Sequence, residues 1–128
     1  MSKKIEQTVT FDAPANEIYD MLMDSKKHAA FTGEEAKIDN TAGGAFTAYD
    51  NFIEGTTIEL EPDKKIIQQW RAADWPEGHY STAIFELSEK NGATTLHFTQ
   101  ENVPDTFAED VADGWHEHYW EKMQSMLK

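Results

Sequence analysis

The chain contains no cysteine and no long apolar run, and each absence excludes a class of protein. Without cysteine there can be no disulfide framework, no thiolate nucleophile and no cysteine-ligated zinc site. No stretch is apolar over the length that a membrane-crossing helix requires, and residues 1–11 lack the apolar core of a signal peptide. We therefore expect a cytoplasmic protein that folds without disulfides.

Positive charge is also scarce. Eleven lysines and arginines stand against 24 aspartates and glutamates, which gives a formal net charge of −13 at pH 7. A chain of this charge is repelled by phosphate backbones and by anionic lipid surfaces, so we expect no nucleic-acid partner and no membrane partner. The simplest interpretation of the acidic charge is that it keeps the protein soluble. The alternative is that it attracts the basic surface of a partner protein.

What the chain does contain is enough apolar material for a core. Its 128 residues are 39% hydrophobic and 12% aromatic, which suits one folded domain over residues 1–128. We expect this domain to stand alone, because no repeat, linker or low-complexity tract divides the sequence. The aromatic fraction is large for a domain of this size, so some of these side chains could line a cavity or a contact surface.

The best-organised stretch is the last one, residues 104–128, which predicts one long helix. Thr106 and Glu109 have the spacing of a capping box, and acidic residues crowd the first turns, as the helix dipole favours. Apolar residues recur at helical spacing, namely Phe107, Val111, Trp115, Tyr119 and Met123, followed by Met126 or Leu127. Gly114 costs such a helix about 1 kcal/mol relative to alanine, and we interpret it as a close approach of the helix to a sheet.

Upstream of this helix, the pattern indicates one strand followed by two short helices. Apolar and polar residues alternate over 4–11, as in a half-buried strand. Pro14 suits the first position of a helix that runs to about Asp24. Residues 25–31 form a second helical turn, which ends at Gly33.

From residue 34 onward the period changes to that of strands. We place these strands at 36–39, 45–50, 53–60, 65–72, 79–87 and 94–101. Turn residues separate them, and the clearest signal is Asn91-Gly92. An antiparallel sheet of this kind needs one covered face, and the long helix is the element able to cover it. The sequence thus predicts an α+β helix-grip fold: a curved antiparallel β-sheet wrapped around a long C-terminal α-helix, with two short helices after the first strand.

Short motifs stand in a characteristic order along most of the chain. The most specific is the run WPEGH at 75–79, which follows Trp70-Arg71. The others are Phe11-Asp12-Ala13-Pro14, Ala30-Phe31-Thr32, Gly43-Gly44-Ala45-Phe46, Glu59-Leu60-Glu61-Pro62, Asn91-Gly92 and Gly114-Trp115. In order and spacing they resemble the Hsp90 ATPase activator homologues, specifically the C-terminal-type domain, within the START/Bet v-like (SRPBCC) helix-grip superfamily.

This resemblance implies a co-chaperone-type regulator in the stress response, with an Hsp90-type chaperone as its partner. The chain departs from the family pattern at His118, where the eukaryotic activators usually carry an aromatic residue, and at Met123 and Gln124, where they carry an Ile-Lys type motif. We expect a non-enzymatic binding protein with no cofactor and no metal. The alternative is a polyketide-cyclase-like enzyme that uses the same helix–sheet cavity.

The first functional hypothesis is a small hydrophobic molecule held in a cavity between helix and sheet. The residues expected to line it are Met21, Phe46, Phe52, Trp70, Phe85, Phe98, Trp115, Tyr119 and Met123. Methionine side chains adapt to irregular ligands, which would suit such a guest. The alternative is that these residues simply fill the core.

The second hypothesis is a partner surface on the loop after Trp70-Arg71. Trp75, held between proline and glycine, could anchor a partner, and Asp74 and Glu77 could attract a basic surface. Alternatively, Trp75 folds back over the edge of the sheet.

Catalytic signals are weak. The chain has no G-x-S-x-G nucleophile elbow, no Walker loop and no dinucleotide fingerprint. His116 and His118 lie two apart on the predicted helix and point in different directions, so they cannot share a metal ion without help from other ligands. A cyclase-like reaction would need a polar acid or base in the cavity, and the available residues are Glu59, Gln68, Arg71, His79 and Tyr80.

Overall fold

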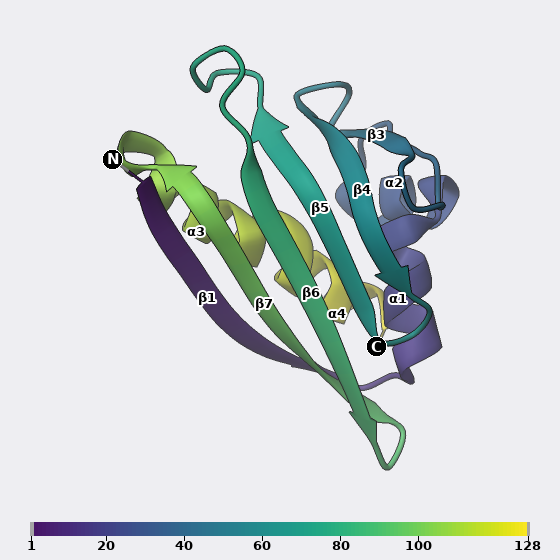
Figure 1. Cartoon of the computed structure of the whole chain (residues 1–128). Helices are drawn as coiled ribbons and strands as arrows, with labels where there is room; N and C mark the ends of the chain where they lie inside the picture. Colours follow the sequence, from purple (N-terminus) through teal and green to yellow (C-terminus); the bar gives the residue numbers. More distant parts are fainter. Residues whose placement is uncertain (1, 128) are drawn as a thin grey trace.

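The computed structural model describes residues 2–127 and contains a seven-stranded antiparallel sheet with helices across one face (Figure 1). The strands are β1 (Ser2–Phe11), β2 (Lys37–Ile38), β3 (Ala45–Ala48), β4 (Ile53–Glu61), β5 (Lys65–Ala72), β6 (Ser81–Lys90) and β7 (Ala93–Pro104). The two short helices are α1 (Ala15–Met23) and α2 (Ser25–Thr32). The long C-terminal helix consists of η1 (Asp105–Phe107), α3 (Ala108–Trp115), η2 (His116–Trp120) and α4 (Glu121–Met126). The predicted helix-grip fold is confirmed.

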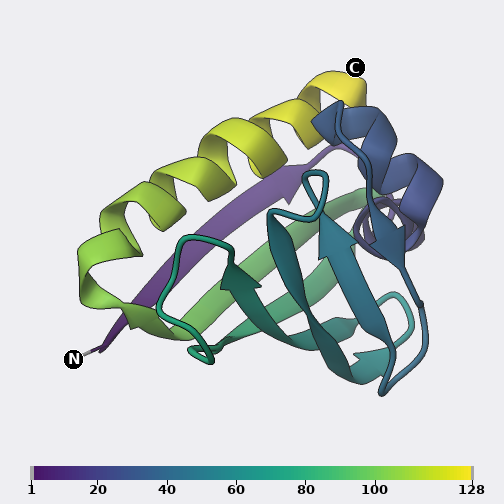
Figure 2. The same cartoon turned by 90° about the horizontal axis from the view of Figure 1, so that it is seen from above.

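The strands follow the order β1-β7-β6-β5-β4-β3-β2 across the sheet. The segment β1-α1-α2-β2 therefore carries the chain from one edge of the sheet to the other, and a meander then returns to β7 beside β1. Seen from above, the C-terminal helix lies along the sheet, while α1 and α2 close one end of the same face (Figure 2). Within residues 2–127, no helix combines the length and the apolarity needed to cross a membrane.

The core lies between the sheet and the helices, because alternate strand residues point inward. On β7 the inward residues are Thr94, Leu96, Phe98 and Gln100, all of them fully buried. The helix contributes Trp115, Tyr119, Trp120 and Met123 to the same core. Aromatic rings dominate the contact between helix and sheet; for example, the Phe98 and Trp115 ring centroids are 4.4 Å apart.

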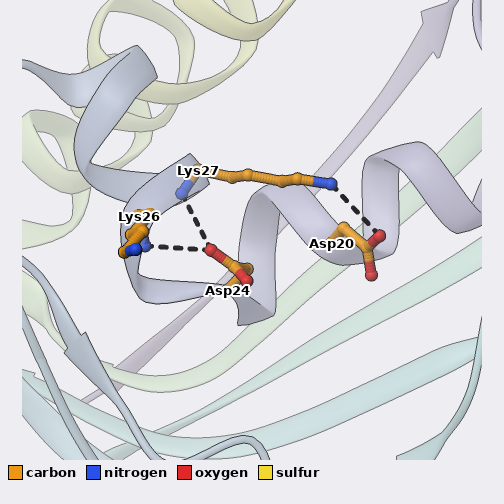
Figure 3. A network of polar contacts seen from close by, with 4 residues as sticks. All are labelled: Asp20, Asp24, Lys26 and Lys27. Carbon is orange, nitrogen blue, oxygen red and sulfur yellow. Dashed lines mark hydrogen bonds and ion pairs between the residues drawn. The ribbon is translucent and has the colours of Figure 1, made fainter.

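Asp24 separates α1 from α2 and caps both. Its backbone N–H donates to the Asp20 carbonyl at the end of α1, while its carboxylate accepts from the backbone N–H groups of Lys26 and Lys27, each at 3.0 Å (Figure 3). An aspartate at this position satisfies two backbone donors that the first turn of α2 would otherwise leave free. The end of α2 is marked by Gly33, whose φ of 79° is the left-handed value typical of a helix C-terminus.

The long helix differs from the prediction at its start and in its middle. It begins with a 3₁₀ turn at Asp105, and no side chain caps either η1 or α3, so the predicted capping box is wrong. Residues 116–120 form a π-helical turn, which is wider than an α-helical one. This turn stacks Trp115 on Trp120, with centroids 5.4 Å apart and an angle of 18° between the ring planes. The apolar stripe predicted from α-helical spacing did not include Trp120, although this residue is only 1% exposed.

The interpretation of Gly114 was also wrong. A Cβ atom at this position would approach only the His118 ring, at an ordinary 3.8 Å, and would not meet the sheet. The close backbone approach lies instead at Gly55 on β4, where a Cβ atom would overlap the Gln69 carbonyl oxygen of β5. Glycine is therefore sterically required at Gly55, whereas nothing in the packing requires it at Gly114.

Candidate functional site

The space enclosed between the helices and the sheet is nearly filled. Among the described residues, the enclosed void has a volume of about 20 Å³, bordered by Gln68, Trp70, Phe85 and Tyr119 among others. A void of this size can hold a single water molecule but not an organic ligand.

A much larger groove opens at the side of the molecule, between the C-terminal helix and the end of the sheet formed by β4 and β5. Its volume is about 680 Å³, within the range of small-molecule sites. Most of its wall is aromatic or aliphatic: Tyr49, Phe52, Ile53, Trp70, Ala72, Trp75, Phe107, Val111, Trp115 and Tyr119. Gly114 and His118 also line it from the helix.

One end of the groove is formed by a sharply bent turn between β3 and β4. Tyr49, Asp50 and Asn51 all have positive φ values, of 51°, 55° and 73°, which is why β3 ends at Ala48 rather than at the predicted residue 50. Such backbone is uncommon for residues other than glycine. The Tyr49 hydroxyl donates to the His118 carbonyl of the π turn at 2.8 Å and so connects this turn to the helix. Burial, reinforced by the negative charge of Glu34, raises the pKa of Tyr49.

Another part of the groove wall is formed by the loop after β5. Trp75 is only 4% exposed, and its ring packs 5.4 Å from that of Trp70. The Arg71 guanidinium holds the loop by donating to the carbonyls of Trp75 at 2.9 Å and Pro76 at 3.3 Å. Of the two alternatives for Trp75, an exposed anchor or a side chain folded back onto the sheet, the structure shows the second. Trp75 thus forms part of the groove wall.

A chain of buried hydrogen bonds fixes the floor of the groove. The Trp115 indole N–H donates to Gln100 Oε1 at 2.8 Å, Gln100 Nε2 donates to Ser81 Oγ at 2.9 Å, and Ser81 Oγ donates to the Trp70 carbonyl at 2.7 Å. This network holds the Trp115 indole by its N–H and ties it to the backbone of Trp70. The sequence analysis did not foresee that Gln100 and Ser81 would bond to each other inside the core, although both share the inward face of their strands with apolar residues.

Part of the groove lining is acidic. Four exposed carboxylates belong to its lining: Asp74 on the loop after β5, and Asp110, Asp113 and Glu117 on the helix. We call these four residues the acidic rim. No lysine or arginine belongs to the lining among the residues that the structure describes.

Behind the groove, Tyr119 contacts a buried histidine that the sequence analysis had not singled out. His28 on α2 is 5% exposed, and its Nδ1 lies 3.3 Å from the Leu22 carbonyl. Because that carbonyl can only accept, Nδ1 carries the proton and Nε2 accepts from the Tyr119 hydroxyl at 3.0 Å. Burial lowers the pKa of His28 to about 4, an effect that the bond to Leu22 partly opposes. Burial also raises the pKa of Tyr119.

The structure divides the predicted cavity residues into three groups. Phe52, Trp70, Trp115 and Tyr119 line the groove. Phe46 and Phe85 border only the small enclosed void, which Trp70, Trp115 and Tyr119 also touch. Met21, Phe98 and Met123 are buried in the core and line neither space. Of the predicted partner surface, Asp74 and Trp75 line the groove, while Glu77 is exposed outside it.

The five residues considered for acid–base chemistry do not gather in one place. Gln68 borders the enclosed void, and Glu59 is exposed on β4. Arg71 and His79 bind backbone carbonyls, and the Tyr80 hydroxyl donates to Glu54. Within residues 2–127, no group of three or more His, Asp or Glu side chains is placed to hold a metal ion.

Comparison with known proteins gives consistent results. A family model described as activator of Hsp90 ATPase homolog 1-like protein matches residues 12–128. An uncharacterized protein of Schizosaccharomyces pombe is 35% identical over 116 residues, which cover 91% of this chain and 34% of that protein. The human activator of 90 kDa heat shock protein ATPase homolog 1 is 32% identical over 118 residues, which cover 92% of this chain and 35% of the human protein.

A solved structure extends the similarity to three dimensions. The crystal structure of an HSP90 activator from Plasmodium falciparum matches with a TM-score of 0.90 and 26% sequence identity, covering 97% of this chain and 95% of that one. Against the yeast and human relatives, by contrast, the chain spans about a third of their length. On the match to residues 12–128, the chain belongs to the family of activator of Hsp90 ATPase homolog 1-like proteins.

Proposed function

We propose that residues 1–128 act as one cytoplasmic binding domain of the co-chaperone type, with an Hsp90-type chaperone as partner and a role in the stress response. Membership of the activator family and the similarity to the human activator support this partner. The observation that carries the binding role is the groove, which is open and largely aromatic and whose Tyr49 turn and loop after β5 are held by hydrogen bonds. None of the five acid–base residues considered above lines it, so we favour binding over a cyclase-like reaction.

The test is titration of the chain with the Hsp90-type chaperone of its own organism, followed by calorimetry and by the ATPase rate of the chaperone. Phe52 is 46% exposed at the groove and can be truncated with little loss of core packing. We expect Phe52→Ala to weaken chaperone binding. The matched control is Ile58→Ala, because Ile58 is a similarly exposed apolar side chain, at 50%, that lies outside the groove. No binding and an unchanged ATPase rate would refute the proposal.

The groove volume favours a second candidate function, the binding of a small hydrophobic molecule. At about 680 Å³ the groove can accommodate such a molecule, and its wall is mostly apolar. Native mass spectrometry of the protein purified without detergent tests this function. An additional mass of a few hundred daltons that disappears on denaturation would support it, and its loss in Phe52→Ala would place the molecule in the groove.

A further inference from the structure

We propose that the groove recognises a protein segment in which a large apolar side chain is flanked by lysine or arginine residues. This inference rests on the proposed function, since it describes the chemistry by which a binding domain of this kind would select its partner. Three features of the groove carry it: the aromatic wall, the acidic rim and the glycine in the helix wall.

The aromatic wall provides the place for the apolar side chain. Phe52 is 46% exposed and Tyr49 is half-buried, while Trp70, Trp75 and Trp115 beneath them are nearly inaccessible. Hydrogen bonds hold the Tyr49 and Trp115 rings, and Trp70 packs against both Trp75 and Trp115, so little ordering is needed on binding. Rigid aromatic walls of this kind are where anchoring side chains contribute most to protein–protein affinity.

The acidic rim selects the flanks of the segment. Asp110, Asp113 and Glu117 line the groove from the helix and Asp74 lines it from the loop after β5, so the carboxylates come from two separate elements of the wall. Because no lysine or arginine among the described lining residues neutralises them, an anionic ligand such as a fatty acid is disfavoured and a neutral one gains nothing from them. Cationic flanks gain from the local charge and from the overall charge of −13, which also accelerates encounter.

Gly114 keeps the groove open. Alanine would stabilise the helix at this position by about 1 kcal/mol, and the structure has room for its methyl group, which would touch only His118 at 3.8 Å. Packing does not require glycine here. Because Gly114 lines the groove, the absence of a side chain leaves the groove volume free. A larger side chain at this position would occupy the space assigned to the apolar anchor.

A fluorescein-labelled, end-blocked peptide, Lys-Lys-Leu-Trp-Leu-Lys-Lys, is a suitable probe, with glutamine and glutamate versions of its flanks for comparison. We expect fluorescence anisotropy to rank binding as lysine over glutamine over glutamate, with the preference for lysine reduced by added salt. Asp113→Lys on the rim and Glu109→Lys on the same helix change the net charge equally, but only Asp113 lines the groove. We expect Asp113→Lys to weaken binding of the lysine probe about tenfold, and Glu109→Lys to weaken it less than about twofold.

Gly114→Leu tests the anchor site, with Gly114→Ala as the milder variant and circular dichroism as the check on folding. We expect both to remain folded, Gly114→Leu to abolish probe binding and Gly114→Ala to weaken it. Equal binding of the three peptides, equal losses in Asp113→Lys and Glu109→Lys, or undiminished binding by Gly114→Leu would each overturn the inference. If the chaperone binds normally to Asp113→Lys and Gly114→Leu, the proposed function stands and only this inference fails. If the probe binds in the groove but the chaperone does not bind, the proposed partner fails instead.

Discussion

Acidification should destabilise this domain through one buried side chain, His28. Its ring lies between the Leu22 carbonyl and the Tyr119 hydroxyl, and burial lowers its pKa from 6.5 to about 4. In the unfolded chain the imidazole binds a proton below about pH 6.5, whereas in the folded protein it stays neutral until about pH 4. The unfolded state therefore binds more protons within this window, and the free energy of unfolding falls as the pH falls.

The two pKa values set the size of the effect. Each unit of pKa difference corresponds to about 1.4 kcal/mol, so His28 should destabilise the fold by about 2 kcal/mol at about pH 5 and by about 3 kcal/mol at about pH 4. Above about pH 6.5 the contribution vanishes, because the imidazole is then neutral in both states.

The assay is urea denaturation at about pH 7, 6 and 5 of the wild type and of His28→Gln. The glutamine amide can still accept from the Tyr119 hydroxyl but binds no proton, so carboxylate titrations common to both proteins cancel in the comparison. Between pH 7 and 5 the wild type should lose about 2 kcal/mol more than His28→Gln. His116→Gln, at an exposed position of the long helix, is the control and should follow the wild type. Parallel curves for the wild type and His28→Gln would show that the buried imidazole does not govern the acid response.

Three further predictions concern the fold. Gln100→Leu should lower the free energy of unfolding by about 2 kcal/mol in urea denaturation, because the buried Trp115 N–H loses its acceptor; Gln69→Leu, exposed on β5, should change it much less. Gly55→Ala should lower the melting temperature markedly because of the overlap with the Gln69 carbonyl, whereas Gly114→Ala should raise it, and equal effects would contradict the packing described for the two glycines. Asp24→Ala should destabilise by about 1 kcal/mol through loss of the α2 cap, and Asp24→Asn, which keeps an acceptor oxygen, should recover most of that loss in the same denaturation assay.

Local patterns in the sequence were sufficient for most of the secondary structure. β5 occupies the predicted range, Lys65–Ala72, because its apolar character and flanking turn residues are local signals. The Asn91-Gly92 turn has the positive φ values, 55° and 81°, that these two residue types tolerate best. Strand and helix periods also determine which faces are apolar. The helix-grip arrangement followed because the apolar face of the sheet must be covered and the long C-terminal helix is the element able to cover it.

The candidate site was only partly accessible to sequence reasoning. The aromatic residues Trp70, Trp115 and Tyr119 were identified because they are large and fall on inward phases of their elements. Between the two alternatives of a helix–sheet cavity and a filled core, the structure shows a nearly filled interior beside an open groove, because the volumes of facing side chains decide whether a space remains. His28 was missed because its partner, Tyr119, lies 91 residues away, and no local pattern predicts such a pairing.

The sequence by itself determined the order and type of the elements, the acidic charge and the family, since these depend on residue identity and short-range spacing. Only the tertiary structure decided that Gly114 lines the groove instead of touching the sheet and that Trp75 is buried. It also decided that a π turn brings Trp120 into the core, and that carboxylates from the loop after β5 and from the helix line one groove. The physical reason is that these features arise from packing between segments distant in the chain, where the shapes and volumes of neighbouring side chains, rather than backbone preference, select the arrangement.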